Sequence, residues 1–428
     1  MFPGDAACQY VLVQASVEPS ITPDPPGMSA GLLFLLATAS GVIVANLYYA
    51  QPLVGPISVS IGLDPKASGL IVTLTQIGYA VGMLFIVPLG DLLENRRMVI
   101  GALLVTLAAL LSAAVSQSQW VFLPSALLIG IGSVAAQVLV PYAAHLTPEA
   151  QRGRAVGSVM TGLLLGIMLS RPTASIIAGL WSWHAVYLFS AVAMTALVIV
   201  LSRKLPPRHP TAKSAYGQLL RSMWQLVLTT PMLRRRAIYH AFMFGAFSLF
   251  WTTVPLLLAS PTFGVSQHGI AVFALVGVAG AIAAPIAGWL ADRGWTRPAT
   301  AAAMLLAVLS FALARSATSG SSAAVAGLCS CAVLLDLGVA ANLVLGQRAI
   351  FVLGAEFRSR LNGLYMSTFF VGGAVGSAVG GWSYFVGGWP LAALLGCAAP
   401  ILAFAYFCTE FRVGRLRNER VACPPPPR

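Results

Sequence analysis

Two charged side chains, Arg171 and Asp336, fall inside long apolar stretches of this 428-residue sequence. A formal charge at the centre of a membrane-spanning helix costs about 3 kcal/mol, so each group needs a polar cavity or a partner. Desolvation of a carboxylate favours proton uptake, which makes Asp336 the candidate for proton coupling. Arg171 stays charged at any accessible pH, and it suits an anionic substrate group or a counter-charge. The alternative for both residues is a hydrogen-bonding anchor between helices.

The two charges are expected at different depths. Arg171 lies 17 residues after Arg154, roughly 25 Å along a helix. Asp336 lies 12 residues before Arg348, roughly 18 Å along its own helix. The heights differ by about two helical turns, so we expect separate roles rather than a direct ion pair.

The composition excludes most other classes of protein. Hydrophobic residues make up 58% of the chain and charged residues 9%, whereas about 25% is charged in ordinary globular proteins. This excludes a soluble enzyme, a nucleic-acid binder and a disordered chain. Cys329-Ser-Cys331 lacks the spacing of a metal or redox pair, and no Gly-rich Lys motif for ATP occurs. The histidines lie at expected loops or helix ends: His145, His184, His209, His240 and His268. They lack the spacing of metal ligands, so we expect no metal site. No nucleophile–base spacing recurs either, and we expect no catalysis and no cofactor.

Twelve apolar runs are long enough to cross a bilayer, for which a helix needs about 20 residues. They fall into two sets of six, separated by a polar gap. The first set is 31–51, 67–89, 98–116, 121–144, 155–180 and 185–205, and the second is 237–259, 269–291, 298–318, 323–345, 361–384 and 390–409. The pattern predicts an all-α membrane protein with twelve transmembrane helices in two pseudo-symmetric six-helix bundles.

The basic residues predict the orientation. With both termini inside, 22 of the 25 lysines and arginines fall in cytoplasmic segments, and only Lys66, Arg171 and Arg315 lie elsewhere. Such asymmetry follows the positive-inside rule. The net charge of +13 is therefore a topology signal, with anionic lipid as the expected contact.

The polar segments divide the chain into five parts. We expect 1–28 to be a disordered N-terminal extension, with Met28 as an alternative start, and 29–205 to be the first bundle. We expect 206–236 to be a cytoplasmic linker, 237–411 the second bundle and 412–428 a cytoplasmic tail. Apolar residues recur at helical spacing from Tyr216 to Val227, which predicts an amphipathic helix on the inner membrane surface. A regulatory docking helix is the alternative reading of this segment.

The two halves repeat each other. Arg152-Gly-Arg154 and Arg358-Ser-Arg360 each precede a Gly-rich helix at an offset of 206 residues, and Asp91 and Asp292 end equivalent helices 201 residues apart. Parallel halves of this kind place a binding cavity at their interface near the bilayer midplane, and they alternate access by rocking.

The loops after the second and eighth helices resemble a signature of the major facilitator superfamily, Gly-x-x-x-Asp-Arg-x-Gly-Arg-Arg. The resemblance covers residues 28–411. In the first half Val87 and Leu92 depart from the signature, and in the second half Trp295 does. In the family these loops form a latch that holds the cytoplasmic side shut, with solvated loop charges as the plain alternative. The matching positions with an implied gating role are Asp91, Arg96, Arg97, Asp292, Arg293 and Arg297.

The fifth helix resembles that of the drug:proton antiporter branch. Gly162 and Gly166 have the small-x-x-x-small spacing that allows close helix packing. Where the branch has a Gly-Pro pair, this sequence has Arg171-Pro172. Helices 1, 4, 7 and 10 line the cavity in the family, which implies substrate contacts for Asn46, Tyr49, Gln137 and Trp251. Asn46 and Tyr49, spaced i and i+3, can both point inward.

The sequence thus predicts a secondary active transporter in a bacterial-type inner membrane that exports a small molecule by proton exchange through alternating access. The alternatives are uptake, or an uncoupled sugar or metabolite carrier. A transporter-like sensor is an alternative of another class, which flux would exclude. Expected partners are a small-molecule substrate, protons and the bilayer. We expect no nucleic acid, and the family resemblance implies a monomer.

Overall fold

The computed structural model describes residues 28–208, 215–315, 317–354 and 357–421, and over these ranges it is helical with no strand. A helix suits a bilayer because all of its backbone groups bond within the segment. Residues 1–27 of the extension predicted at 1–28, residues 209–214 of the predicted linker and residues 422–428 of the tail predicted at 412–428 lie outside the described residues.

The first bundle contains the helices before the linker. They are α2 (Ala30–Ala45), α3 (Val54–Ser60), α4 (Leu70–Phe85), α5 (Asn95–Ala114), α6 (Gln119–Ser133), α7 (Ala135–His145), α8 (Arg152–Leu180) and α9 (Trp183–Lys204). Short 3-10 turns join several of them: η1 (Gln51–Leu53), η2 (Pro65–Ala67), η3 (Val87–Asp91) and η4 (Glu149–Gln151).

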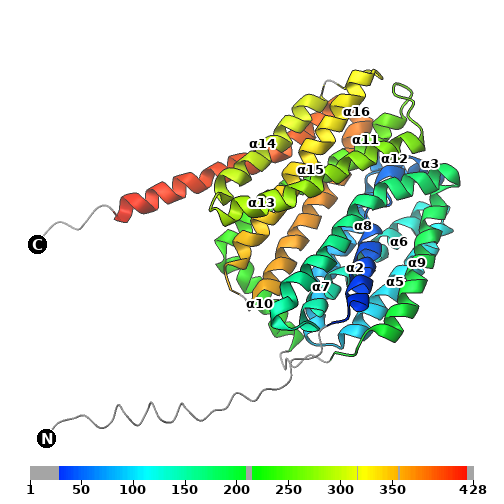
Figure 1. Ribbon diagram of the computed structural model, residues 1–428. Helices are drawn as coiled ribbons and strands as arrows, with labels where there is room; N and C mark the ends of the chain where they lie inside the picture. The colour runs from blue at the N-terminus through cyan, green and yellow to red at the C-terminus, as the bar shows by residue number, and fades with distance from the viewer. Residues whose placement is uncertain (1–27, 209–214, 316, 355–356, 422–428) are drawn as a thin grey trace, which may run out of the picture.

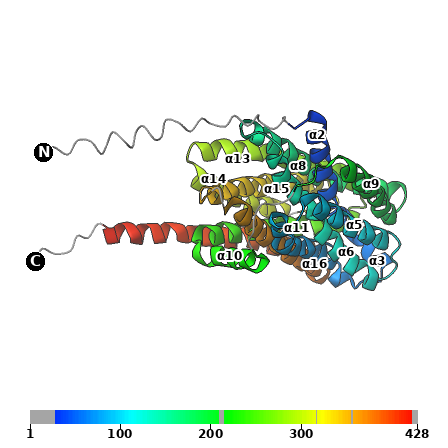
Figure 2. The same ribbon diagram turned by 90° about the horizontal axis from the view of Figure 1, so that it is seen from below.

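The second bundle follows the linker helix α10 (Tyr216–Thr229). It contains α11 (Pro231–Ala259), α12 (Gln267–Leu275), η5 (Val276–Ile282), α13 (Ala283–Asp292), α14 (Thr296–Ala314), α15 (Ser322–Phe351) and α16 (Arg358–Val421). Figure 1 shows the two bundles side by side, and Figure 2 shows α5, α6 and α9 on the opposite side of the molecule from α13 and α14.

The twelve predicted spans correspond to these helices. Within the described residues, ten helical segments are long and apolar enough to cross a membrane. One of them, Arg358–Glu410, contains two spans, because Gly387 and Gly388 leave helical geometry and Gly388 has φ of +65°. Glycine adopts this left-handed conformation without a Cβ clash. The first span is the 16-residue α2, which η1 and α3 extend after a turn.

Glycines allow the closest helix contacts, and the same arrangement occurs in both bundles. A Cβ on Gly162 would lie 2.2 Å from the Ala37 carbonyl oxygen, and one on Gly166 would lie 2.1 Å from that of Gly41. In the second bundle Gly372 and Gly376 approach Ala241 and Gly245 in the same way, at 2.2 and 2.0 Å. Small residues let helix backbones approach in lipid, where hydrophobic burial gives little drive for association.

The bundles meet along α4 of the first and α11 and α16 of the second. The hydroxyl groups of Thr73 and Ser377 are 2.8 Å apart, and the Gln76 amide donates to Ser248 at 2.9 Å. We call the end where α5, α8, α14 and α16 begin the basic end. At the opposite end α11 packs against η1 and α3, η2 packs against α16, and α8 packs against α12.

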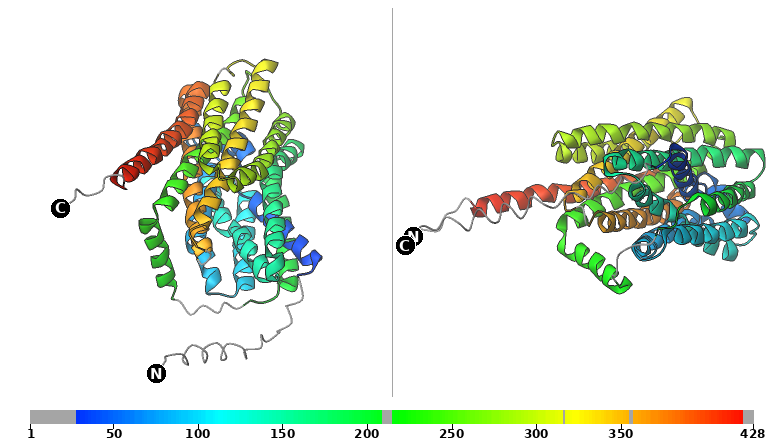
Figure 3. Two further views of the ribbon diagram at one scale, coloured as in Figure 1. Left: turned by 60° about the vertical axis from the view of Figure 1, so that its left-hand side comes forward. Right: turned by 60° about the horizontal axis from the view of Figure 1, so that its bottom comes forward.

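The linker helix α10 contacts both bundles at the basic end. The Tyr216 hydroxyl donates to the Phe85 carbonyl of α4 at 2.8 Å, and Arg360 of α16 donates to the Ser222 hydroxyl at 3.0 Å. Leu219 and Met223 are buried, whereas Trp224 is 64% exposed. Figure 3 shows α10, in green, at the lower left of its left-hand view.

The glycine contacts predict that Gly166→Ala lowers the free energy of unfolding by about 1–3 kcal/mol, because the added methyl group overpacks α8 against α2. Gly157→Ala, on the same helix, is the matched control, since a Cβ there meets nothing within 4 Å. Thermal unfolding of the purified protein in detergent measures both. Equal melting temperatures for the two variants would show that α2 and α8 can separate without cost.

Candidate functional site

The candidate site is a group of buried side chains around Trp251 at the interface between the bundles. The Trp251 indole N–H donates to Asp336 Oδ1 at 3.0 Å. The Arg171 guanidinium lies over the face of the same indole, 4.3 Å from the ring centroid. Arg171 comes from α8 of the first bundle, whereas Trp251 and Asp336 come from α11 and α15 of the second. The indole therefore connects a carboxyl group and a guanidinium that belong to different bundles.

Arg171 is surrounded by aromatic rings and an amide rather than by a carboxylate. Its Nε donates to Gln51 Oε1 at 2.7 Å, and its guanidinium carbon also lies over Phe247 at 5.0 Å and over Tyr48 at 5.4 Å. Only 3% of Arg171 is exposed. Cation–π contacts become stronger when the cation is desolvated, so these rings stabilise a charge that the amide satisfies only in part.

Two donors in this group have no hydrogen-bond acceptor: Arg171 Nη2 and Gln51 Nε2. A buried N–H without an acceptor costs about 1–3 kcal/mol, and more when the group is charged. Both donors belong to adjacent side chains at the bundle interface. An oxygen atom with two free lone pairs would satisfy both donors.

Asp336 is enclosed by the 3-10 segment of the eighth span. A Cβ on Gly277 would lie 2.8 Å from Asp336 Oδ2, and a Cβ on Gly280 would lie 2.8 Å from the Asp336 Cβ. η5 can approach α15 this closely only because both positions are glycine. Asp336 is 6% exposed, and it interacts electrostatically with Arg171.

The sequence expectation for the two charges was partly right. Arg171 and Asp336 are not an ion pair within 4.0 Å among the contacts of the described residues, as their different depths predict. They nevertheless contact the same side chain, which the sequence did not indicate. Counting residues along straight helices gives depths, but it does not give the reach of an indole between two helices.

Asn46 and Tyr49 have different surroundings, and their expected role as substrate contacts stays a prediction. Asn46 accepts a hydrogen bond from Ser190 of α9 within the first bundle. Tyr49 lines a groove of about 640 Å³ between α2 and α8. α2 ends at Ala45, and the chain continues in turns with i to i−3 bonds, such as Tyr48 N–H to the Ala45 carbonyl.

Gln137 and the gating candidates make no direct contact with Trp251 or Asp336 among the contacts of the described residues. Gln137, on α7, is close to Tyr79 of α4. Arg96 donates to the Ser202 carbonyl, and Arg97 pairs with Glu94 at 2.7 Å. The side chain of Asp91 lies outside the described residues.

In the second bundle, Asp292 pairs with Arg348 of α15. Arg293 stacks on Trp289 at 3.6 Å, and Arg297 lies 4.0 Å from Glu410. Each of these pairs joins residues of the same bundle, so the described contacts do not form a latch between the bundles.

Two buried polar residues were missed by sequence reasoning. His240 was expected at a helix end, but it is fully buried in α11, between the rings of Tyr365 and Phe369 and with Nδ1 2.9 Å from the Asn342 amide nitrogen. Arg236 is 6% exposed and donates to Thr300 at 3.0 Å. The seventh span begins at Pro231, six residues earlier than its apolar run predicts. Proline is common at the first position of a helix, so Pro231 could have indicated this earlier start.

Comparison with known proteins places this chain in a family. Residues 32–350 match the model described as Major Facilitator Superfamily. "Uncharacterized transporter YgaY" of Escherichia coli O157:H7 is 37% identical over 88% of this chain and 94% of its own. "Probable nitrate/nitrite transporter NarK2" of Mycobacterium tuberculosis (strain CDC 1551 / Oshkosh) is 28% identical over 65% of this chain and 72% of its own.

A solved structure has the same fold. The crystal structure of the nucleoside transporter NupG (D323A mutant) superposes with a TM-score of 0.72, at 14% identity, over 89% of this chain and 100% of that one. This likeness supports the two-bundle architecture. The chain belongs to the major facilitator superfamily and is a multi-pass membrane transporter.

Proposed function

We propose that this transporter exports a small molecule in exchange for protons, with Asp336 as the residue that takes up the proton. The observation that carries the proposal is the Trp251 indole, which bonds to Asp336 and lies beneath Arg171. A carboxylate at Asp336 balances the charge of Arg171 across the bundle interface. A proton on Asp336 removes this balance, so protonation changes the free energy of holding the two bundles together.

The same arrangement supports alternating access. Proton-dependent attraction between α8 and α15 acts at the surface where the bundles rock against each other. The contacts of η1, α3 and η2 with the second bundle lie at the end opposite the basic end. We propose that this end is closed here, that the basic end faces the cytoplasm of a bacterial-type cell with both termini on that side, and that the gating arginines form contacts between bundles in the opposite state.

Proton-coupled uptake of an anion is the second candidate. It is favoured by the unpartnered Arg171 Nη2 and Gln51 Nε2, which can donate to a carboxylate, nitrate or phosphate oxygen. The name of the Mycobacterium tuberculosis relative, a nitrate/nitrite transporter, agrees with this ligand class. Protonation of Asp336 leaves Arg171 uncompensated and strengthens anion binding, so the proton and the anion bind together.

The sign of proton movement separates the two candidates. Inside-out vesicles without an imposed pH gradient are mixed with a panel of drugs, sugars, nucleosides and small anions. Antiport makes the vesicle lumen alkaline as substrate enters, whereas symport makes it acidic. Binding of a compound without any flux would instead support the transporter-like sensor.

Asp336→Asn is expected to insert and fold but to reduce substrate-driven proton movement to the level of vesicles that lack the protein. Asparagine keeps an acceptor for Trp251 but cannot take up the proton. Asp64→Asn, in the loop before α4, controls for loss of a carboxylate. Counterflow of labelled substrate without a gradient should survive in both variants. Full proton movement in Asp336→Asn would make Asp336 an anchor for Trp251 and remove its coupling role.

Gln51→Glu is expected to weaken transport of an anionic substrate about tenfold or more, because a carboxylate beside Arg171 occupies the site as an internal anion. Transport of an uncharged substrate should be affected much less. Gln225→Glu, which adds the same charge at an exposed position of α10, is the matched control. The ratio of initial uptake rates for the two substrate types measures the effect, and an unchanged ratio would exclude Arg171 as the anion contact.

A further inference from the structure

A second cavity, of about 900 Å³, opens at the basic end of the second bundle. Arg236 in its wall precedes Trp251 on α11 by 15 residues, roughly 22 Å of helix, so the cavity is separate from the site around Trp251. Four arginines and one carboxylate line it: Arg236, Arg297, Arg348, Arg358 and Asp292. Its lining is therefore strongly cationic.

Arg236 is a buried cation with an unfilled donor. Its Nη1 donates to Thr300 at 3.0 Å, but its Nε has no hydrogen-bond partner. The side chain is 6% exposed, and it lines the cavity. An arginine held in this way presents a fork of donors, which matches the geometry of carboxylate and phosphate oxygens.

The N-terminus of α14 contributes a second attraction for anions. Gly294 and Thr296 line the cavity at the start of this 19-residue helix, and no side chain caps the helix at Trp295. The first N–H groups of a helix lack partners within the helix, and its dipole favours a negative charge at this end. Arg236 and α14 approach the cavity from different helices, so the two features are independent.

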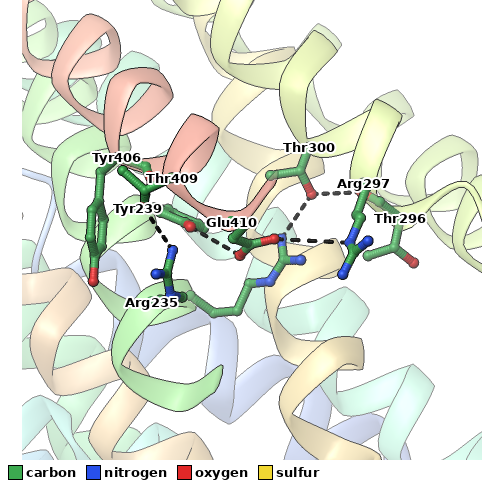
Figure 4. Close-up of polar contacts among 9 residues, drawn as sticks. Arg235, Tyr239, Thr296, Arg297, Thr300, Tyr406, Thr409 and Glu410 are labelled. Atoms are coloured by element: carbon green, nitrogen blue, oxygen red, sulfur yellow. Dashed lines mark hydrogen bonds and ion pairs between the residues drawn. The ribbon is translucent and has the colours of Figure 1, made fainter. Parts of the chain in front are cut away.

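The carboxylates nearby only partly neutralise the arginines. Asp292 is paired with Arg348. Glu410 accepts from the Tyr239 hydroxyl at 2.9 Å, and its other oxygen is 4.0 Å from Arg297, beyond hydrogen-bond distance. Figure 4 shows Glu410 between Tyr239 and Arg297. Arg358 donates to the Phe351 carbonyl at 3.5 Å, a neutral acceptor.

We propose that this cavity binds a phosphate ester through Arg236, Arg297 and Arg358 and the N-terminus of α14. The phosphate belongs either to the headgroup of an anionic phospholipid or to a soluble metabolite. Trp295 next to the cavity is 58% exposed, and tryptophan is frequent at the level of lipid headgroups. A bound phosphate joins α11, α14 and α16, and it thereby stiffens the basic end of the second bundle.

Thermal unfolding of the full-length purified protein in detergent tests the proposal. Dioleoylphosphatidylglycerol, sn-glycerol 3-phosphate and inorganic phosphate are the probes, at constant ionic strength. Dioleoylphosphatidylcholine, whose phosphate is offset by choline, and chloride are the controls. We expect at least one phosphate probe to raise the melting temperature of the wild type, and neither control to do so.

Arg297→Gln and Arg358→Gln are the variants of choice, because both side chains are exposed and their loss leaves the buried Arg236 in place. Each is expected to weaken the apparent affinity for the effective probe about tenfold, the effect of losing one charged hydrogen bond. Arg152→Gln is the matched control. Arg152 is the counterpart of Arg358 in the first half, and it likewise donates to a loop carbonyl, that of Thr147, at 3.3 Å.

A response to phosphatidylglycerol without a response to the soluble phosphates identifies a lipid site, and the reverse identifies a metabolite site. The proposal is wrong if no phosphate probe raises the melting temperature. It is also wrong if Arg297→Gln and Arg358→Gln respond like Arg152→Gln, because the charge would then act elsewhere on the surface. These outcomes do not depend on transport activity, so they are independent of the proposed coupling through Asp336.

Discussion

The buried charge of Arg171 is the constraint on which the centre of the molecule depends. A guanidinium that is 3% exposed has lost nearly all of its hydration, which costs several kcal/mol unless protein groups replace the water. Gln51 and Tyr48 of its own bundle replace part of the water, Phe247 and Trp251 of the other bundle add cation–π contacts, and Nη2 is left without an acceptor. No single bundle can solvate this cation alone. The interface between the bundles is therefore an electrostatic structure as much as an apolar one.

Much of the fold follows from the length and polarity of the apolar runs. A bilayer accepts few alternatives to a helix of about 20 residues, so the positions of Arg171, Trp251 and Asp336 on separate helices were readable. The direction of a side chain could be predicted from the sequence only where the helix is regular. Gln51 lies in η1 and Asn46 in the turn after α2, and for these residues no helical period predicts which neighbour they face.

Other features depend on contacts that a single sequence does not display. Gly277 and Gly280 read as unremarkable small residues until η5 is seen against Asp336. His240 lies three residues after the predicted start of the seventh span at 237, so it was expected at a helix end. It is buried because α11 starts earlier and because Phe369 and Tyr365 of α16 cover its ring.

The internal repeat is more exact in packing than in sequence. The loop arginines align at an offset of 206, whereas Gly162 and Gly166 correspond in their contacts to Gly372 and Gly376, at an offset of 210. The difference of four residues is about one helical turn, so the glycines stay on the same helix face. Both halves therefore have the same close contact between two helix backbones, but in the second half the glycines lie four residues further along the helix from the loop arginines.

The linker helix α10 is held differently by the two bundles. Among the described residues, its hydrogen bond to the first bundle is the neutral one from Tyr216 to the Phe85 carbonyl, whereas its contact with the second includes a charged donor, Arg360. Bonds with a charged partner are the stronger kind. If the bundles rock as proposed, the bond to Phe85 is expected to break before the bond from Arg360, so that α10 would move with the second bundle. α10 then belongs mechanically to the second bundle, and the amphipathic helix at the basic end would change its place on the membrane surface together with that bundle.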